Sequence, residues 1–455
     1  MRTRLILCST LFQLISTAAM KDAGVFGTDR CVLILTNTSA NPELVPGVAE
    51  APGVREALLQ TFDTVISLDE WIAPFHPREW RVAPANGPML ERMFRSIWGL
   101  GDEPLELITE SLPNAPGGAL ATALPSALVS MHSDGLMSYG PVRRALPAQV
   151  AQRFEAIYYV DLIPGLIPTR LDDYAPRHIA APAASLRDVF SRLAEVTMTT
   201  VPNISSLAGL TETALLLGQY LTAIGILTPA EELALHMDMV DAAMERGISD
   251  IVFKPHPSAP PADIHDLRAH ARARGAQLTV ITAPVSAEAL FATMNPAVVI
   301  SCFSTAMTTA SAVYGLPAAA VGTDLVLPRL VPYQNSNRIP VALIDAVFRQ
   351  GLPAPADTES PAPADDLQGL LNALSYTLQP HFYDYWRDET ADYLRAVDGT
   401  ALMRYFSPGR LRRLGLPGAP PTTPSSRLVQ LAKRPAKAVL SPASRRRLRS
   451  LVKRH

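Results

Sequence analysis

A lysine and a histidine follow a short apolar segment in Asp250-Ile-Val-Phe-Lys-Pro-His-Pro257. Ile251 to Phe253 are apolar and largely β-branched, which predicts a short buried strand. The prolines on either side of His256 end that strand, because proline donates no backbone hydrogen bond and fixes the backbone around it. Ligands bind at the carboxyl ends of strands in open α/β sheets, where an imidazole can donate hydrogen bonds to a phosphate and transfer a proton. We therefore interpret His256 as a catalytic residue, with Lys254 and Pro257 in the substrate-binding site.

A group of hydroxyl side chains follows another apolar segment, in Val298-Val-Ile-Ser-Cys-Phe-Ser-Thr305. The segment predicts a buried strand that ends before Ser301, and Ser304 or Thr305 is placed to cap the following helix. The free N–H groups and the positive dipole end of a helix N-terminus favour an anion, and the hydroxyls add donors. We therefore predict that Ser301, Ser304 and Thr305 contact substrate. A purely structural cap is the alternative for Ser304 and Thr305, although a cap and a phosphate site use the same donors.

An acidic residue and a glycine close a third segment, Leu128-Val-Ser-Met-His-Ser-Asp-Gly135. Asp134 can act as a general base, and Gly135 permits a sharp turn in the substrate-binding site. An ordinary Asp-Gly turn is the structural alternative. Gln13, just after the predicted first strand, is a further candidate for contact with the donor or acceptor, and an ordinary first helical turn is the alternative there.

Along the chain, the Asp-Gly motif comes first, the His-Pro motif second and the paired Ser/Thr motif third. Motifs in this order resemble those of the bacterial sialyltransferases and polysialyltransferases of GT-B fold. The opening segment Leu5-Ile-Leu-Cys-Ser-Thr-Leu-Phe-Gln-Leu-Ile15 is also similar to the start of those proteins, and the resemblance covers roughly residues 1–405. Ser133 stands where that family usually has a second acidic residue, so Asp134 is the only candidate base in its motif. A second His-Pro pair, His76-Pro77, lies in a polar segment with no apolar strand before it and is not expected in the site.

The resemblance implies an inverting glycosyltransferase that moves sialic acid, or a related ulosonic acid, from a CMP-activated donor to a glycan or glycolipid acceptor of a bacterial capsule or surface polysaccharide. Asp134 would deprotonate the acceptor hydroxyl, and His256 would serve the departing phosphate as an acid or hydrogen-bond donor. Ser304 and Thr305 would hold that phosphate. No cofactor is expected besides the CMP-sugar co-substrate, and the lack of a DxD pair at a strand end favours a metal-independent reaction.

Two other functions are compatible with these motifs. Polyol-phosphate transferases of the teichoic-acid type, which use CDP-activated donors, also carry a Lys-Pro-His-Pro-like motif and a later serine pair, although the Asp134-Gly135 pair favours the sialyltransferase. A non-catalytic GT-B relative that binds a nucleotide or a glycan is the other, and Ser133 is the feature that keeps it open. Nucleic-acid binding is not expected, because the basic tail has no interleaved aromatic side chains to stack on bases.

The composition indicates a folded protein with more than one domain. Of 455 residues, 48% are hydrophobic and 18% charged, and the length suits two domains of about 150 to 200 residues. Cys8, Cys31 and Cys302 are scattered in or beside predicted strands, which favours reduced thiols in the cytoplasm. No CxxC or HExxH spacing indicates a metal site. Arg2 and Arg4 before an apolar segment resemble a signal peptide, but polar interruptions of that segment favour a strand, a turn and a helix.

The net charge of −2 conceals a basic C-terminal tail. From Gly409 onward there are thirteen Lys and Arg residues and no Asp or Glu. Peripheral contact of this tail with the anionic inner face of the plasma membrane and a solvated, disordered tail are both open. The sequence contains no run of eighteen apolar residues, so no transmembrane helix is expected. Four other basic residues are candidates to face a polyanionic acceptor, with a solvated surface as the alternative: Arg92, Arg95, Arg143 and Arg144.

Apolar runs alternate with helical patterns, as in βα units, and predict an α/β fold with two facing Rossmann-like domains of six units each. Ala156 to Val160 is expected to be the last strand of the first domain, Val54 to Phe62 a helix, and Thr228 the cap of a helix that starts at Pro229. The crossover between the domains is expected within 201–210.

This organisation predicts the GT-B arrangement, with the substrate cleft between the two domains. An N-terminal acceptor-side domain is expected at 1–205 and a nucleotide-sugar-binding domain at 206–350. A Pro/Ala-rich loop and return helices follow at 351–406, and the basic, proline-broken tail at 407–455. The helix predicted at 384–397 is the candidate to return and pack on the first domain.

Overall fold

The computed structural model describes residues 2–133, 135–200, 212–256, 264–283, 285–349, 364–397, 399 and 404–419, with only the backbone of 197–200 and 364–366. Asp134, Pro257, the predicted crossover at 201–210, the loop at 352–363 and the tail from residue 420 lie outside the described residues. The chain divides into two compact units, Met1–Ala396 and Val397–His455, and each is described by itself. The second unit contains α17 (Pro408–Leu414), which Gly415 ends in a left-handed conformation.

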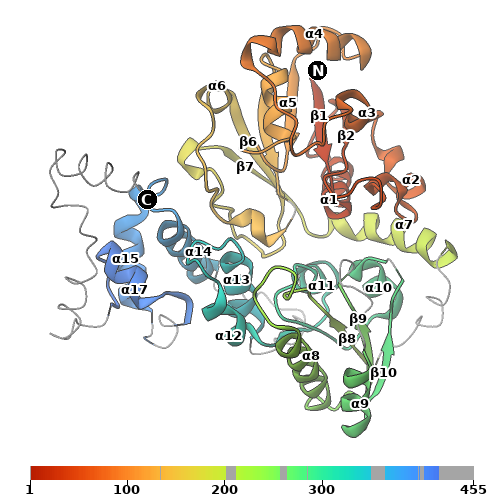
Figure 1. Cartoon of the computed structure of the whole chain (residues 1–455), viewed down its shortest axis with the longest axis vertical. Coiled ribbons are helices and arrows are strands. Elements are labelled where there is room, and N and C mark those ends of the chain that lie inside the picture. The colour runs from red at the N-terminus through yellow and green to blue at the C-terminus, as the bar shows by residue number, and fades with distance from the viewer. Residues whose placement is uncertain are drawn as a thin grey trace, which may run out of the picture. The chain divides into compact units, whose positions relative to one another are not determined.

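The first unit begins with a sheet of seven parallel strands in the order β3-β2-β1-β4-β5-β6-β7 (Figure 1). We call the part of the chain built on this sheet the first domain. The strand order reverses between β1 and β4, which is where doubly wound sheets bind ligands. Its strands are β1 (Thr3–Cys8), β2 (Arg30–Leu35), β3 (Thr64–Ser67), β4 (Leu105–Thr109), β5 (Leu128–His132), β6 (Phe154–Val160) and β7 (Arg177–Ala181).

A second sheet of five parallel strands follows in the order β10-β9-β8-β11-β12. We call this part the second domain, and its strand order reverses between β8 and β11. Its strands are β8 (Thr213–Leu217), β9 (Asp250–Lys254), β10 (Gln277–Val280), β11 (Val298–Ser301) and β12 (Ala318–Ala320). The chain therefore contains the two Rossmann-like domains that make up a GT-B protein, and the predicted α/β fold class is confirmed.

Helices cover both faces of the first sheet, and in both domains they alternate with the strands along the chain. Thr228 caps α8 as predicted. Its side chain accepts a hydrogen bond from the backbone N–H of Glu231, and the Glu231 carboxylate accepts one from the backbone N–H of Thr228. Among the described residues, no helix is long and apolar enough to cross a membrane. The helices of the first unit are α1 (Leu11–Asp22), α2 (Val54–Ala57), α3 (Leu68–Ile72), α4 (Gly87–Ile97), α5 (Gly117–Ala123), α6 (Ala148–Ala151), α7 (Ser185–Thr200), α8 (Pro229–Met244), α9 (His265–Ala273), α10 (Ala287–Met294), α11 (Ala306–Tyr314), α12 (Thr323–Val326), α13 (Arg338–Phe348), α14 (Ala364–Leu378) and α15 (Arg387–Ala396).

The first sheet is buried on both faces. Leu5 and Leu7 of β1 enter the core on one face, and Ile6 and Cys8 enter the core on the other. A continuous apolar run is the expected sequence of a strand that is covered on both sides. Cys8, Cys31 and Cys302 are buried and none of them forms a disulfide bond, as predicted.

Three details of the predicted fold are wrong. Among the described residues, the two sheets contain seven and five strands instead of six each, and the first sheet ends at β7, not at β6. The residues of β7 are largely half-buried or exposed, as suits an edge strand, so no apolar run marks it in the sequence. The helix predicted over Val54 to Phe62 is α2 followed by a short 3₁₀ turn (Leu59–Thr61), because Leu58 leaves the helical conformation at φ −121°.

The C-terminal part of the first unit returns to the first domain. The hydroxyls of Ser375 on α14 and Thr169 lie 2.7 Å apart. Tyr383 donates to the carbonyl oxygen of Thr169 at 2.7 Å, and Tyr385 donates to Asp172 at 2.9 Å. Both tyrosines lie at the 3₁₀ turn η8 (Asp384–Trp386), which precedes α15. These contacts with the first domain are made by α14 and by the 3₁₀ turn at the start of the predicted helix 384–397.

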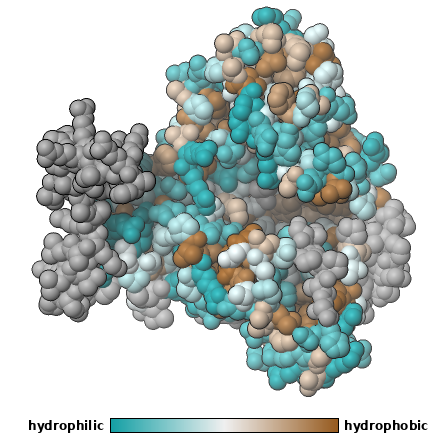
Figure 2. All heavy atoms as spheres, viewed as in Figure 1, coloured by the Kyte–Doolittle hydropathy of each residue, from teal (hydrophilic) through white to brown (hydrophobic). Residues whose placement is uncertain are grey.

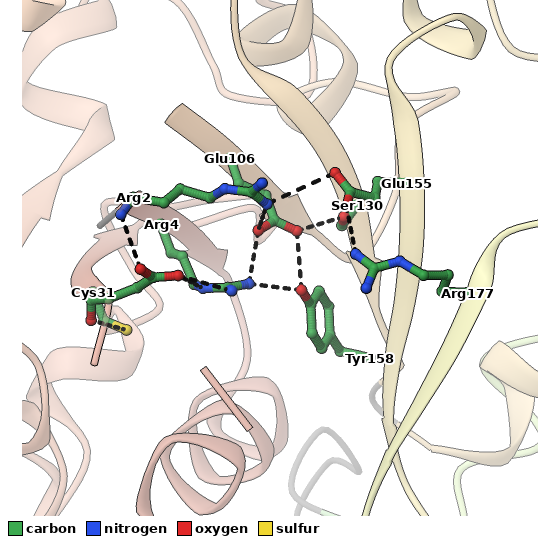
Figure 3. Close-up of polar contacts among 9 residues, drawn as sticks. Arg2, Arg4, Cys31, Glu106, Ser130, Glu155, Tyr158 and Arg177 are labelled. Carbon is green, nitrogen blue, oxygen red and sulfur yellow. Dashed lines mark hydrogen bonds and ion pairs between the residues drawn. The ribbon is translucent and has the colours of Figure 1, made fainter. Parts of the chain in front are cut away.

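A buried carboxylate joins four strands of the first sheet (Figure 3). Glu106 of β4 is fully buried and accepts hydrogen bonds from Arg2 at 3.0 Å, Arg4 at 2.7 Å, Ser130 at 2.7 Å and Tyr158 at 3.1 Å. Burial, followed by the neighbouring Glu106 charge, raises the pKa of Tyr158 to about 12, so its phenol stays protonated and can donate. The cluster satisfies every oxygen of Glu106 and fixes β1 against β4, β5 and β6.

Replacing Glu106 with alanine would leave Arg2 and Arg4 without their shared carboxylate. We expect the free energy of unfolding, measured by urea denaturation, to fall by about 3–5 kcal/mol, the usual cost of removing one member of a buried ion pair. Asp102 is an exposed acid of the same domain, and Asp102→Ala should change stability by less than about 0.5 kcal/mol. Equal effects of the two substitutions would show that the cluster does not stabilise the sheet.

Candidate active site

The glycine of the Asp134-Gly135 motif meets the hydroxyl motif across the two domains. Gly135, just after β5, has φ +142° and ψ −174°, a conformation that only glycine adopts readily. A Cβ atom at Gly135 would lie 3.1 Å from Oγ1 and 3.3 Å from Cγ2 of Thr305, at the start of α11. Gly135 of the first domain therefore lies directly against the hydroxyl motif of the second.

A cleft of about 460 Å³ lies at this meeting point. Lys254, His256, Ser304 and Thr305 all line it, so the structure brings together four of the residues predicted to bind or transform substrate. The second domain supplies most of the lining, largely from segments that follow its strands: Leu217–Gln219, Lys254–His256, Val285–Glu288 and Phe303–Ala306, with Pro340 of α13. Phe12 and Met137 reach the cleft from the first domain.

Lys254 is buried, and the positive charge of its side chain is stabilised by a nearby buried acid, Glu288. Its side chain is 6% exposed, and burial lowers the pKa of Lys254 while the nearby Glu288 carboxylate opposes that shift. Burial in turn raises the pKa of Glu288. Glu288 lies in the first turn of α10 and was missed by sequence reasoning, because an acid in the first turn is an ordinary helix feature.

His256 lies on the solvent-accessible side of the cleft. Its partial enclosure lowers the pKa of the imidazole, the positive charge of Lys254 lowers it further, and Glu232 opposes both. Glu232 is itself held by the backbone N–H groups of Leu221 at 2.7 Å and Thr222 at 3.2 Å. The imidazole is therefore neutral near pH 7 until an anion arrives to favour its charged form.

The Ser304 hydroxyl caps α11 by accepting a hydrogen bond from the backbone N–H of Ala306 at 3.3 Å. Thr305 has helical dihedral angles, and its carbonyl oxygen accepts from the backbone N–H of Thr308 at 3.0 Å. Ser304, Thr305 and Ala306, at the start of α11, therefore line the cleft together. The cap and the phosphate site, both predicted from the sequence, are compatible in this geometry.

Two other predicted residues lie elsewhere. Ser301 is fully buried and donates to the carbonyl oxygen of Leu217 at 2.8 Å, so it joins β11 to β8 instead of lining the cleft. The Gln13 side chain accepts from the backbone N–H of Ser9 at 2.7 Å, which orders the turn after β1. Gln13 lines a second cleft, in the first domain.

That second cleft, of about 760 Å³, lies at the carboxyl ends of β1, β2 and β4, where the strand order reverses. Arg78, Arg81 and Arg144 are exposed and line it. Of the four basic residues predicted to face an acceptor, Arg144 alone lines this cleft, and Arg95 is held by Glu91 at 3.0 Å. Sequence reasoning missed Arg78 and Arg81, because neither belongs to a motif.

The other predictions around the motifs fit this geometry. His132 is buried, and its Nε2 atom lies 2.9 Å from the carbonyl oxygen of Leu7, so it packs within the sheet. Ser133 is buried beside it, and its backbone N–H donates to the carbonyl oxygen of Tyr158 at 2.8 Å. The second His-Pro pair is remote from the three motifs: Nε2 of His76 lies 2.8 Å from the carbonyl oxygen of Ser39.

A model of the family described as alpha-2,8-polysialyltransferase (POLYST) matches residues 4–323. The chain belongs to this family. The protein is accordingly a glycosyltransferase, and the resemblance seen in the sequence is confirmed. No curated protein matches the chain with significance.

Solved structures with similar folds share little sequence with this polysialyltransferase-family protein. The sialyltransferase GT-B domain from Photobacterium damselae is 12% identical over 68% of this chain and 88% of its own, with a TM-score of 0.35. MurG from Acinetobacter baumannii is 12% identical over 95% and 99%, with a TM-score of 0.37. UDP-GlcNAc 2-epimerase from Methanocaldococcus jannaschii is 10% identical over 70% and 83%, with a TM-score of 0.39. Similarities at these TM-scores assign no activity.

Gly135→Ala tests the approach of the two motifs. We expect it to cost about 1–3 kcal/mol of stability through backbone strain, and to reduce transferase activity as well, because its Cβ pushes against Thr305. Gly247→Ala is the matched control, since Gly247 also has positive φ but no atom within 4 Å of an added Cβ. Thermal denaturation and donor turnover measure the two effects. Gly135→Ala with the activity of Gly247→Ala would show that the contact does not position the site.

Proposed function

We propose that this glycosyltransferase moves sialic acid, or a related ulosonic acid, from a CMP-activated donor to a glycan acceptor with inversion at the anomeric carbon. The observation that carries the proposal is the convergence of Lys254, His256 and the hydroxyl-capped start of α11 in one cleft. A cation, an imidazole and a helix N-terminus form a site suited to a phosphate. The family model supports the sialyl group as the transferred sugar.

The second domain holds the donor in this proposal. The N–H groups at the start of α11 and the hydroxyls of Ser304 and Thr305 donate to the non-bridging phosphate oxygens. Lys254 supplies a positive charge at short range, strengthened by its burial. Pro257 fixes the backbone beside His256. With the charge of the phosphate met by side chains and helix donors, the proposed reaction requires neither metal nor cofactor.

The transfer step is an in-line displacement. Asp134 takes the proton of the acceptor hydroxyl as its oxygen forms a bond to the anomeric carbon, and the bond from that carbon to the CMP phosphate oxygen breaks. His256 donates a hydrogen bond or a proton to the departing phosphate, which carries the electron pair away. The contact of Gly135 with Thr305 supports this assignment, because Gly135 directly follows Asp134 in the sequence and Thr305 belongs to the proposed phosphate site.

We propose that the acceptor is an anionic glycan or glycolipid held in the cleft of the first domain. Arg78, Arg81 and Arg144 supply exposed positive charge there, and Gln13 lies in the same lining. Carboxylates spaced along a sialylated chain are suitable partners for arginine side chains. The proposed location is the cytoplasm, with the basic tail in peripheral contact with the anionic inner face of the plasma membrane, where a capsule or surface polysaccharide is extended.

Release of CMP from CMP-sialic acid by the purified protein, with a sialylated acceptor present, tests the assignment. We expect His256→Ala and Asp134→Ala each to lower kcat by about 10²–10⁴, the usual contribution of a positioned acid or base. His76→Ala removes the histidine of the other His-Pro pair and should leave turnover unchanged.

Turnover lost only in His256→Ala would place the base outside the Asp134 motif. Wild-type protein that binds CMP without turning over the donor would be a binding relative, and absence of CMP binding would refute the donor assignment. Release of CMP from a CDP-polyol instead would identify the polyol-phosphate transferase.

CMP binding should also take up protons through His256. The pKa of His256 is depressed in the free site, and a bound phosphate raises it, so affinity is greatest below the free-state pKa and falls as pH rises through the bound-state pKa. Isothermal titration calorimetry in two buffers of different ionisation enthalpy measures this uptake. Comparison with His256→Asn cancels the titration of the CMP phosphate itself. The same pH dependence in both proteins would exclude a phosphate contact by His256.

A further inference from the structure

A stripe of apolar side chains is exposed along α4 of the first domain. Met89, Met93 and Ile97 lie four residues apart, so they share one side of the helix. Their exposed fractions are 53%, 41% and 40%. We call these three residues the α4 stripe. Figure 2 shows apolar surface in the region where Figure 1 places α4.

The stripe cannot turn inward, because the opposite side of α4 is fixed in the core. Phe94 and Trp98 are buried and stacked at 4.1 Å between ring centroids. Glu91 is buried next to them and accepts from the backbone N–H of Ser126 at 2.9 Å and from Arg95 at 3.0 Å. The apolar side chains of α4 therefore extend around more of the helix than the core covers, and those of the α4 stripe face solvent.

The charges on α4 complement an anionic surface. Arg92 is exposed between Met89 and Met93 in the sequence. Glu91 is the only acid in the helix, and it is buried against Arg95. An amphipathic helix with apolar side chains beside an exposed cation is the kind of element that lies in the headgroup region of a membrane.

The area of the α4 stripe distinguishes between two possible partners, a lipid surface and a second copy of the chain. Three half-exposed side chains form a patch of at most a few hundred Å², whereas a stable protein interface buries about 800 Å² on each partner. Insertion into a lipid interface has no such threshold, since its strength grows with each buried apolar group. We propose that the α4 stripe docks the first domain on an anionic lipid surface.

The docking is a second, apolar contribution beside that of the basic tail. Stable attachment to a membrane generally takes two weak elements, and a polybasic segment with an apolar insertion is such a pair. The thirteen basic residues from Gly409 onward provide the electrostatic part, and salt screens it. The apolar part supplied by α4 resists salt. This inference is independent of the donor sugar.

The test is co-sedimentation of the full chain with vesicles of phosphatidylglycerol and phosphatidylcholine, at low salt and at about 1 M salt, where the Debye length is about 3 Å. We expect wild-type binding to persist in part at high salt. The variant Met89→Ser, Met93→Ser, Ile97→Ser should lose roughly tenfold or more of that residual partitioning, as expected for three apolar groups withdrawn from lipid. It should retain binding at low salt.

A matched control is Ile224→Ser with Val331→Ser, which changes two exposed apolar side chains of the second domain, 56% and 74% exposed. This control should bind vesicles as the wild type does at both salt concentrations, and both variants should keep the wild-type melting temperature. Unchanged salt-resistant binding in the α4 variant, or no wild-type binding to vesicles, would overturn the proposal. A wild-type dimer that the α4 variant converts to a monomer, with vesicle binding unaltered, would assign the stripe to a copy-to-copy interface instead.

Discussion

The close approach of Gly135 to Thr305 is the constraint around which the site is built. An added Cβ would meet the threonine at 3.1 Å, and the glycine conformation is itself unsuited to other residues. The contact continues along the same turn, where a Cβ at Gly140 would lie 2.5 Å from Ile339 of α13. A short segment after β5 is thus packed against two helices of the second domain. The segment after β5 and the two helices of the second domain can approach so closely only because glycine stands at both contact points.

The parts of this arrangement that sequence alone could predict are those encoded locally. The strand before Lys254 and the strand before Ser304 follow from apolar runs, and prolines or a cap mark their ends. Parallel pairing then brings the ends of β9, β8 and β11 to one edge of the sheet. Residues that follow strand ends therefore converge whatever the loops do, which is why the sequence could predict that His256 and Ser304 lie in one cleft.

What the sequence did not predict depends on tertiary neighbours. Ser301 is the last residue of β11, and its hydroxyl is bound to the carbonyl oxygen of Leu217, whereas Ser304, three residues further on, lines the cleft. Glu288 is an ordinary first-turn acid until β9 places Lys254 beside it. Arg78 and Arg81 have no motif, and only the fold of the first domain brings them to the cleft that Arg144 also lines. The edge strand β7 lacks an apolar run because solvent covers much of it.

The charged groups in the cleft that contains Lys254 and His256 compensate one another in the free protein. Lys254 is buried opposite Glu288, so in the empty site the cost of burying a cation is offset by a nearby acid. His256 is kept neutral by the same lysine and by partial enclosure. In the reaction that we propose, the phosphate of the donor reverses both effects, because it pairs with Lys254 and stabilises the charged imidazole. Positive charge would then increase at the phosphate when the donor binds, whereas the free cleft avoids an uncompensated cluster of cations.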